Sequence, residues 1–568
     1  MAPSTANIRA PPTKEDRTDV KRMKKASSEV SDFIKSKFYP GLFDQENRDS
    51  IRKYVASSKP YPHCKIDKLV NDDLLRRVQK EIFTHLNFTT KETDIYKVNQ
   101  TGDLANMDGL GEEERQKLAS LFELRNAIYS KEFREFVSEV TGCGPLSPSK
   151  MDMSVNTYTA GCHLLNHDDV IGTRRVSFIL YMPGDPDEHW DPAFGGALEL
   201  YPTIEPDTPA PEPSVSVPPQ WNSFAMFTVL PGYSFHSVEE VVVENKPRLS
   251  IQGWFHFPQE GEFGYKKDAE KIKGYSTQKQ VEEPKDDGKD FVNYTNELDD
   301  TALLGLSEED LKELATWINP VYLNAKYMKQ ITDKFVDDSA VQMKEFLKEE
   351  LYAKIKAATY NADKKDNFLK PEMPPHGSGV RGDWYVQGPP VYQRFLTLTE
   401  DVKSDEETSV LFKDLRDKFQ SESFRRWLAV LSQLSPRGYR GDARRFRPGH
   451  DYTLAKINLR GQPILDVTLS MATTPDVDAA EKWESCEYGG YECYMAAPEG
   501  GEDPATYRQT ADEDAALLTL GAGANELSIV MKDEGVLRFV KYVSARAPGS
   551  RWDVAYEYDL PNDKEESA

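Results

Sequence analysis

The sequence HLLNHDDVIGTRRVSFILYMPG spans residues 163–184 and decides how the first half of the chain is interpreted. Its apolar, β-branched run at 176–182 ends at Pro183-Gly184, which is a strong turn signal. Runs of the same kind, each directly followed by proline, lie at 197–201, 224–230 and 249–257. Many short strands separated by turns predict an antiparallel sandwich or jelly roll. The polar, proline-rich segment 203–219 predicts a long exposed loop.

Helical patterns precede these strands and return after them. Apolar residues at three-to-four spacing predict a helix capped by Asp72 and a longer helical stretch over 118–137. A capping box at Ser307-Glu308-Glu309-Asp310 opens a second helical region that runs to about Ala358. Strand-like segments then extend over 384–558. Both halves follow the order helices, then strands, which predicts an α+β fold of two related domains, although no direct sequence repeat is evident.

The chain length of 568 residues suits two large domains joined by a linker. Residues 1–27 are rich in Pro, Ser, Thr and charge and are predicted to form a disordered tail. The first domain is expected over 28–258. Residues 259–300 are charged and poor in apolar side chains, which predicts a linker. The second domain is expected over 301–568.

The overall charge restricts the kinds of partner. A formal net charge of -24 repels phosphates, so direct nucleic-acid binding is not expected, whereas a basic protein partner is favoured. The same acidity also serves plain solubility. No run resembles a secretion signal or a membrane span, so we expect an intracellular protein without a membrane partner. The basic cluster 21–25 is either a nuclear import signal or a solvated patch.

His167 and Asp169 form a His-x-Asp pair at the centre of the decisive stretch. Residues two apart on a strand point to the same face, so both side chains can meet one metal. His236 follows the next Pro-Gly turn and supplies a second imidazole. Two imidazoles and one carboxylate leave three open positions, which suits Fe(II) that must bind a keto acid and oxygen together. His-x-Asp alone is a weak signal, because that spacing is common by chance.

Arg248 strengthens the interpretation. The run Arg248-Leu-Ser250 lies twelve residues past His236, at the start of an apolar strand. A guanidinium there can clamp the far carboxylate of 2-oxoglutarate, with the Ser250 hydroxyl assisting. A buried arginine also requires an anionic partner. Zinc fits the same triad, but zinc hydrolases need no such clamp, so iron is favoured.

Three further residues are candidates for the same pocket. Tyr181 ends the strand that follows His167, and it either binds the keto acid or packs in the core. Tyr158 and Asn156 share one face of the preceding strand and are predicted to line the pocket. Three other histidines of this half are not assigned to the metal: His163, His189 and His256.

Longer runs carry a resemblance to a known family. The chain resembles the eukaryotic ribosomal prolyl hydroxylases, a family of Fe(II)/2-oxoglutarate oxygenases that includes the yeast termination-and-polyadenylation protein and its fission-yeast and animal relatives. The resemblance rests on the opening run, on LPGYSFHSVEEV (230–241) and on RLSIQGWFHFP (248–258), together with 94–103 and 444–454. It extends from about residue 30 to the C-terminus.

The resemblance implies a fold and a site. It implies two double-stranded β-helix (jelly-roll) domains flanked by helices, of which only the first is catalytic and the second binds substrate or partners. It places iron on His167, Asp169 and His236, and 2-oxoglutarate on Tyr181 and Arg248. Oxygen is the second cosubstrate, and ascorbate is expected to support turnover. Gln100 and Asp103 lie in a segment expected to close over the substrate as a loop.

The implied substrate is a proline of the decoding-centre protein of the small ribosomal subunit. The resemblance implies 3-hydroxylation or 3,4-dihydroxylation of this proline, with an effect on the accuracy of translation termination, in the nucleus and the cytoplasm. Further expected partners are translation termination factors, the poly(A)-binding protein or a transcription factor. The main alternative is an oxygen-sensing regulatory protein that controls transcription-factor turnover. A lipid or nucleic-acid oxygenase is a weaker alternative, because the acidic composition does not support it.

The second half is not expected to bind metal. His376 and His450 are its only histidines, and neither begins a His-x-Asp pair. No histidine follows His450, so the order of the first triad cannot recur.

Overall fold

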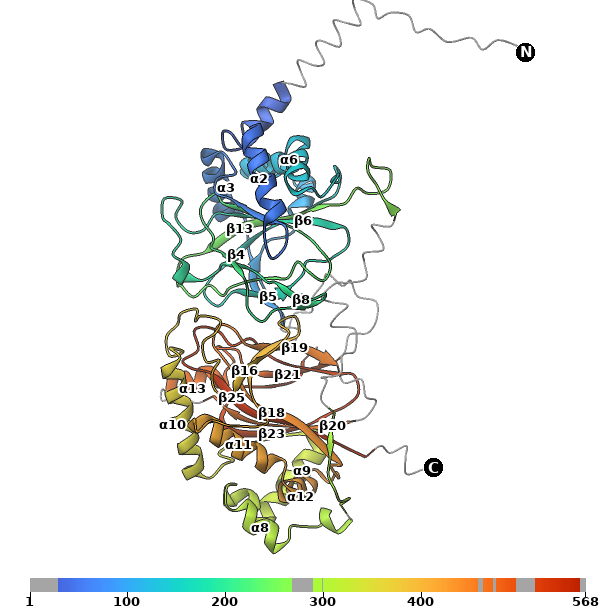
Figure 1. The fold of residues 1–568 in the computed structure, drawn as a ribbon, viewed down its shortest axis with the longest axis vertical. Helices are drawn as coiled ribbons and strands as arrows, with labels where there is room; N and C mark the ends of the chain where they lie inside the picture. Colours follow the sequence, from blue (N-terminus) through green and yellow to red (C-terminus); the bar gives the residue numbers. More distant parts are fainter. Residues whose placement is uncertain are drawn as a thin grey trace, which may run out of the picture.

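The computed structural model describes residues 29–267, 290–298, 300–457, 463–472, 474, 477–496 and 516–561. The predicted tail 1–27 lies outside the described residues, as do 268–289 and 299 of the predicted linker. Two curled antiparallel sheets dominate the rest, one in each half of the chain. The helices of the first half lie at one end of the long axis, several helices of the second half lie at the other end, and the two sheets lie between them (Figure 1).

The helices of the first half pack on one side of its sheet. They are α2 (Gln45–Ser57), α3 (Asp72–His85), α4 (Glu112–Lys117), α5 (Ala119–Ile128) and α6 (Lys131–Thr141). The cap of α3 is Asn71, whose side chain accepts from the Leu74 amide, so the prediction of Asp72 as the cap is off by one residue. The single helical stretch over 118–137 is also wrong, because Ser130 caps a new helix, α6. The sequence pattern does not reveal the break between α5 and α6, because the apolar spacing continues across it.

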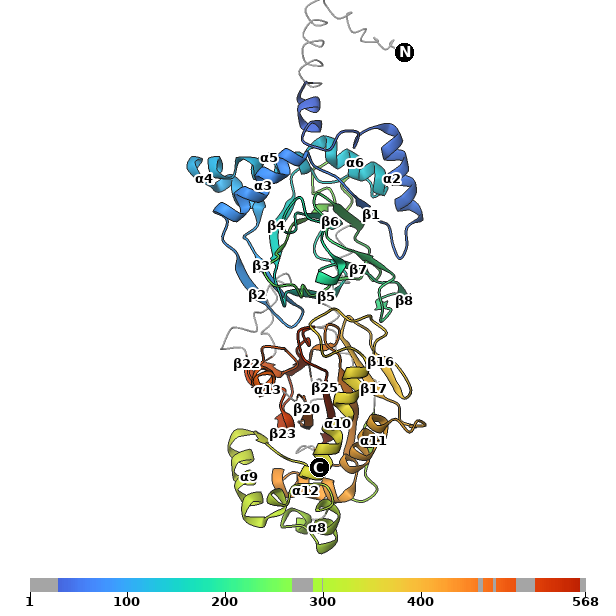
Figure 2. The ribbon, with the colours of Figure 1, turned by 90° about the vertical axis from the view of Figure 1, so that its left-hand side faces the viewer.

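The first sheet has eleven strands in the order β1-β11-β6-β13-β4-β3-β5-β12-β7-β10, with β2 paired to β3. Its strands are β1 (His63–Ile66), β2 (Thr89–Glu92), β3 (Tyr96–Gln100), β4 (Met151–Tyr158), β5 (His163–His167), β6 (Arg174–Tyr181), β7 (Leu198–Leu200), β10 (Val215–Val217), β11 (Phe224–Thr228), β12 (His236–Val238) and β13 (Arg248–His256). Strands β3 to β7 curl around a common axis below the helices (Figure 2). The predicted loop 203–219 instead holds β10 and the small hairpin β8 (Thr203–Glu205) and β9 (Thr208–Pro209).

A large apolar core joins the helices to this sheet. Phe133 of α6 lies against Phe224 of β11 with ring centroids 5.8 Å apart, and Phe178 of β6 stacks on Phe224 at 5.4 Å. All three rings are fully buried. Strands β6 and β13 therefore bury one face against the helices and leave the other to face the inside of the curled sheet, where the site lies.

The second half repeats this architecture. Its helices are α8 (Glu308–Leu314), α9 (Ala325–Asp338), α10 (Glu349–Lys365), α11 (Glu407–Phe419), α12 (Glu422–Ser432) and α13 (Val477–Glu484). The predicted capping box at Ser307 and Asp310 is confirmed. The principal strands are β15 (Ala340–Met343), β16 (Trp384–Gln387), β17 (Gln393–Leu398), β18 (Gly438–Phe446), β19 (Tyr452–Ile457), β20 (Ile464–Met471), β21 (Glu492–Ala496), β22 (Ala516–Leu520), β23 (Ala524–Lys532), β24 (Val536–Val540) and β25 (Arg551–Asp559). Part of the predicted linker forms β14 (Val292–Asn293), which pairs with β18.

The two sheets have the same topology. The second runs β15-β23-β20-β25-β18-β17-β19-β24-β21-β22, with β16 on β17, which matches the first strand for strand. The runs FGGALEL (194–200) and YGGYECY (488–494) occupy equivalent places before and within β7 and β21. A Cβ on Gly195 would lie 2.0 Å from the Glu240 carbonyl oxygen, and one on Gly489 1.9 Å from that of Tyr542. The α+β fold of two jelly-roll domains is confirmed, and it contains an internal repeat. No helix among the described residues is long and apolar enough to span a bilayer.

Candidate active site

The three predicted metal ligands meet on the inner face of the first sheet. His167 ends β5, His236 begins β12, and these two residues are paired across the ladder. Nε2 of His167 lies 3.5 Å from Oδ1 of Asp169, and Nε2 of His236 lies 3.5 Å from Oδ2 of the same carboxylate. The three ligand atoms all lie within 4.8 Å of one another. This arrangement can surround one metal ion on one side.

Asp169 reaches the metal position from a turn, not from the strand that the spacing suggested. Strand β5 ends at His167, and Asp169 adopts a left-handed backbone with φ of 62°. Two groups hold its Oδ2 atom at 2.9 Å each, the Ser177 hydroxyl and the indole N–H of Trp254. The unusual backbone conformation is therefore supported by side-chain hydrogen bonds from the neighbouring strands.

The protonation pattern suits metal binding. Nδ1 of His167 lies 2.9 Å from the Leu165 carbonyl, and Nδ1 of His236 lies 2.8 Å from the Ser234 carbonyl. A carbonyl can only accept, so each Nδ1 carries a proton, and Nε2 is the nitrogen of each ring that would bind a metal. Burial opposes ionisation of Asp169, but the interactions with His167 and His236 outweigh burial and keep the pKa of this carboxyl well below its usual range. Burial lowers the pKa of His167, but Asp169 raises it on balance, and a bound metal would take the place of the proton on Nε2. Two neutral imidazoles and one carboxylate fit Fe(II).

Arg248 lies beside the triad with unused hydrogen-bonding capacity. It is 1% exposed, its Nε donates to the Gly196 carbonyl at 2.6 Å, and its Nη1 reaches Ser250 Oγ at 3.5 Å. The guanidinium lies 4.7 Å from the Tyr158 ring and 5.0 Å from the Tyr181 ring. No carboxylate of the described residues forms an ion pair with it in this structure. A ligand carboxylate would supply the missing counter-ion.

The other predicted pocket residues surround the same space. Three buried polar atoms there form no hydrogen bond to the described part of the chain: Nη2 of Arg248, the Tyr181 hydroxyl and Oδ1 of Asn156. Buried polar atoms are rarely left unsatisfied, so three in one pocket indicate a polar ligand. Burial raises the pKa of Tyr181, so its hydroxyl keeps the proton and can donate. The pocket therefore fits a dicarboxylate such as 2-oxoglutarate, with its far end on Arg248.

A cavity of about 320 Å³ opens in front of the triad. Its lining includes Asn156, Tyr158, His167, Asp169 and Trp254 as well as Gln100 and Asp103, the two predicted substrate residues. The segment 94–103 is not a free loop as predicted. Half of it forms β3, which pairs with β4 and β5 within the sheet. The segment is predicted as a loop because it is polar, but its polar residues alternate along a strand, and one face of that strand lines the cavity.

Trp254 and Ser177 are positioning residues that the spacing of the metal ligands did not reveal. The Trp254 ring also stacks on the Arg174 guanidinium, 3.5 Å from the ring centroid, and Nη1 of Arg174 lies 3.6 Å from Oδ1 of Asp169. No local motif marks these residues, because they reach Asp169 from separate strands. Only the order of strands β6 and β13 brings them together.

Replacing Trp254 by phenylalanine is expected to weaken iron binding by roughly 10- to 100-fold, the usual cost of losing a hydrogen bond to a metal ligand. The phenyl ring keeps the packing beside Arg174 but cannot donate to Asp169. Iron affinity is measured by titration under anaerobic conditions. Trp221→Phe is the matched control, since the Trp221 indole donates to Asp72, away from the triad. Equal iron affinity in Trp254→Phe and wild type would show that Ser177 alone orients the carboxylate.

Gly196 is required by the Arg248 side chain. Its φ is 76°, and an added Cβ would lie 2.7 Å from Cδ of Arg248. We expect Gly196→Ala to displace the guanidinium and to raise the KM for 2-oxoglutarate by roughly 10- to 100-fold. Gly184→Ala introduces similar backbone strain, at φ of 53°, with nothing within 4 Å, and serves as the control. A normal KM in Gly196→Ala, measured by succinate formation, would contradict this assignment.

A second cluster of potential ligands lies between the two halves. It comprises Glu199, Glu239 and His376. Nη2 of Arg394 lies 2.7 Å from Nδ1 of His376, and an arginine can only donate. Nε2 of His376 therefore carries the proton and donates to Glu199 at 2.5 Å. His376 therefore has no free lone pair that faces the carboxylates and cannot bind a metal together with them. The cluster instead joins the two halves through hydrogen bonds.

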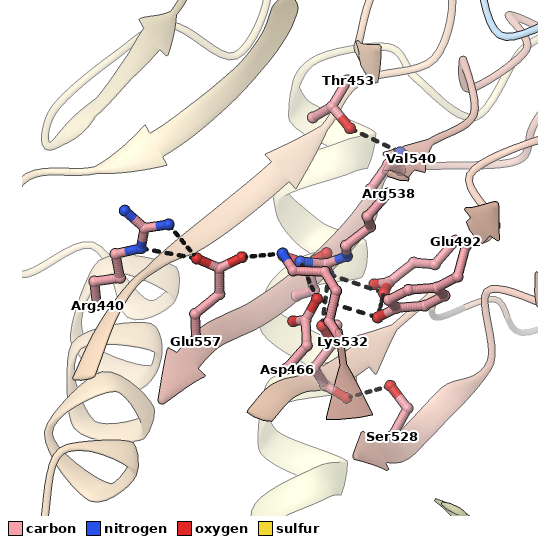
Figure 3. Close-up of polar contacts among 12 residues, drawn as sticks. Arg440, Thr453, Asp466, Glu492, Ser528, Lys532, Arg538, Val540 and Glu557 are labelled. Carbon is pink, nitrogen blue, oxygen red and sulfur yellow. Dashed lines mark hydrogen bonds and ion pairs between the residues drawn. The ribbon is translucent and has the colours of Figure 1, made fainter. Parts of the chain in front are cut away.

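The inside of the second sheet is closed to iron by its own side chains. Arg538 pairs with Lys456 across β19 and β24, at the bulged ladder position that His236 and His167 occupy in the first sheet. Arg538 binds Asp466 at 3.0 Å and Glu492 at 2.8 Å. Figure 3 shows this ion-pair network, in which Lys532 and Arg440 share Glu557. A cation thus stands where the first half has its second imidazole, which repels a metal ion.

Comparison with known proteins agrees with this division. A model described as 2OG-Fe(II) oxygenase superfamily matches residues 153–256, and one described as oxoglutarate and iron-dependent oxygenase degradation C-term matches 309–567. The prolyl 3,4-dihydroxylase OGFOD1 of Ostreococcus tauri is 37% identical, over 89% of this chain and 96% of that protein. The prolyl 3-hydroxylase OGFOD1 of Mus musculus is 28% identical, over 88% and 89%. A solved Pseudomonas putida prolyl-4-hydroxylase has 22% identity and a TM-score of 0.25, covering 37% of this chain and 98% of that one.

Proposed function

Because the chain belongs to the OGFOD1 family of prolyl hydroxylases, within the 2-oxoglutarate and iron(II)-dependent oxygenases, we propose that it hydroxylates a prolyl residue of a protein substrate. One observation carries the proposal: the triad and the unsatisfied Arg248 pocket adjoin one open cavity. Fe(II) is the cofactor, and 2-oxoglutarate and oxygen are the cosubstrates. Each turnover converts 2-oxoglutarate and O2 to succinate and CO2, with one oxygen atom inserted into a proline C–H bond.

The residues divide the work. His167, Asp169 and His236 would hold iron, and bound iron with 2-oxoglutarate supplies the oxidising power. Arg248 binds the far carboxylate of the keto acid, and the Tyr181 hydroxyl donates a further hydrogen bond. Both side chains are buried, so water competes little with the far carboxylate for these hydrogen bonds. The chain thus contributes orientation and charge compensation.

The proposed substrate is the decoding-centre protein of the small ribosomal subunit. The net charge of -24 supports a basic partner of this kind through long-range attraction. We further propose that the modification affects translation termination accuracy, that ascorbate keeps the iron reduced, and that the protein works in the nucleus and cytoplasm. Termination factors and the poly(A)-binding protein are the proposed further partners. One named relative is a 3,4-dihydroxylase and the other a 3-hydroxylase, so the experiment below distinguishes one added hydroxyl group from two.

Mass spectrometry of a peptide from the decoding-centre loop tests the substrate. The peptide is incubated with enzyme, Fe(II), 2-oxoglutarate and oxygen, with scrambled-sequence and proline-to-alanine peptides as controls. A gain of one oxygen on the proline supports 3-hydroxylation, and a gain of two supports dihydroxylation. If the enzyme binds iron and 2-oxoglutarate yet leaves this peptide unmodified, the ribosomal substrate is wrong.

A role in regulated degradation is a second candidate. The match of residues 309–567 to a family model named for degradation favours it. In that case the second half binds a transcription factor and the iron site senses oxygen. A His236→Ala variant that loses hydroxylation but still controls the abundance of the bound factor would favour this role.

A further inference from the structure

The second half of the chain contacts the catalytic half through the segment that follows β24. Lys541 begins this segment, and its side chain is only 2% exposed. Its Nζ donates to the Thr93 carbonyl and lies 3.3 Å from Oε1 of Glu92. Both partners belong to the β2–β3 hairpin of the first half. Burying an ammonium group costs free energy, and these contacts offset that cost.

The same hairpin forms one wall of the active-site cavity. Five of its residues line that cavity: Lys91, Ile95, Tyr96, Val98 and Gln100. The hairpin therefore separates the substrate space on one side from the second half on the other. A shift of the hairpin by about 1 Å would alter the shape of the cavity without touching any metal ligand.

The hairpin is weakly supported within its own sheet. Among the described strands, β2 pairs with β3 alone, off the main strand path. Strand β3 has two residue pairs with β4, at Asn99 and Gln100, and two with β5, at Tyr96 and Lys97. Two-stranded hairpins are marginally stable on their own. Strand β2 and the turn are therefore the parts of the hairpin that contacts from outside the first sheet stabilise most.

The second half supplies those contacts at the hairpin turn. Oδ2 of Asp94 accepts a hydrogen bond from the Ala455 amide at 3.2 Å. Ile95 packs in a buried apolar cluster that joins the halves, together with Leu165, Tyr452, Leu454 and Tyr542. The turn is thus held by a salt bridge, a backbone hydrogen bond and apolar packing.

The metal-bearing strand is held from the same side. The ring of His163, at the start of β5, lies 4.1 Å from that of Tyr542. Four residues later β5 ends at the metal ligand His167. One short segment, 541–546, therefore contacts both the substrate wall and the strand that carries the metal ligand. Ser544 and the Ala545 amide also bind Glu240, which follows the strand that begins with His236.

We propose that the second half is a clamp for the active site, and that Lys541 is a positioning residue that holds the β2–β3 hairpin where it receives the peptide substrate. This proposal rests on the proposed prolyl hydroxylase function for its kinetic consequences, but not for its structural one. In this proposal the second half contributes to catalysis by stabilising one wall of the active-site cavity, although ion pairs fill the inside of its own sheet.

The test compares Lys541→Met with Lys532→Met in the full chain. Lys532 is another buried lysine of the second half, but its partner Glu557 lies inside the second sheet. We expect Lys541→Met to raise the KM for the peptide at least 10-fold and to leave kcat and the KM for 2-oxoglutarate within about 2-fold. Lys532→Met should not change the peptide KM. Lys541→Arg, which keeps the charge, should restore most of the affinity.

Hydrogen exchange provides a readout that needs no substrate. Amides of 89–100 should exchange at least 10-fold faster in Lys541→Met than in wild type or Lys532→Met. Glu92→Gln, which alters the ion pair from the catalytic side, should give the same pattern if Lys541→Met fails to fold. Unchanged hairpin exchange, or equal changes in Lys532→Met, overturns the clamp. If wild type fails to hydroxylate the peptide while hairpin exchange responds as expected, the substrate assignment fails and the clamp stands.

Discussion

Replacing His236 by alanine is expected to reduce prolyl hydroxylation by roughly three orders of magnitude or more, because the metal loses one of three protein ligands. His236 begins β12 and pairs with His167, so no neighbouring side chain can take its place without moving the ladder. Its Nδ1 proton is fixed by the Ser234 carbonyl, which leaves Nε2 to bind iron. Activity is followed by mass spectrometry of the peptide, and iron content by metal analysis.

His256→Ala is the matched control for this experiment. His256 is also buried in the first sheet, at the end of β13, but it interacts with Thr173 and not with the triad. It should retain iron and most of the activity. If His236→Ala kept normal iron content and hydroxylation, the triad would not be the metal site.

Replacing Arg248 by methionine is expected to raise the dissociation constant for 2-oxoglutarate by roughly 100-fold, equivalent to about 3 kcal/mol from two charge-assisted hydrogen bonds. Methionine fills much of the same volume, so the walls made by Tyr158 and Tyr181 should persist. Binding is measured by calorimetry without oxygen, with Mn(II) in place of iron.

Arg248→Lys separates charge from geometry. Lysine keeps a positive charge but cannot present two parallel N–H groups, so its affinity should fall between wild type and Arg248→Met. Iron binding should be unchanged in both variants. Wild-type affinity for 2-oxoglutarate in Arg248→Met would remove this arginine from the pocket.

Much of this site could be predicted from the sequence because its chemistry is carried by few residues in a fixed order. Three of these residues, His167, His236 and Arg248, lie at strand ends, and Asp169 lies two residues past one. What the sequence could not provide is the backbone of Asp169, which leaves the strand, and its support by Ser177 and Trp254. The two hydrogen bonds depend on which strands lie side by side, and an antiparallel sheet can have many different strand orders.

The internal repeat was also hidden in the sequence. The two sheets share their topology and the bulge that β12 forms with β5 and β24 forms with β19, yet the second sheet has Arg538 at the position of His236. Ion pairs occupy the inside of the second sheet, so its inward residues differ in type from those of the first sheet, and the paired glycines at 195–196 and 489–490 are the clearest local similarity. The interface between the halves is equally invisible to local patterns, because Lys541 and Glu92 lie far apart in the chain.

This chain is expected to couple 2-oxoglutarate turnover to hydroxylation of a proline. The most direct measurement is the ratio of succinate formed to hydroxyl groups gained on the peptide, at increasing peptide concentration and with 2-oxoglutarate and Fe(II) saturating. We expect a ratio that approaches one, and loss of both products in His236→Ala. Succinate formation that is indifferent to every prolyl peptide, with no oxygen gained on proline, would contradict it.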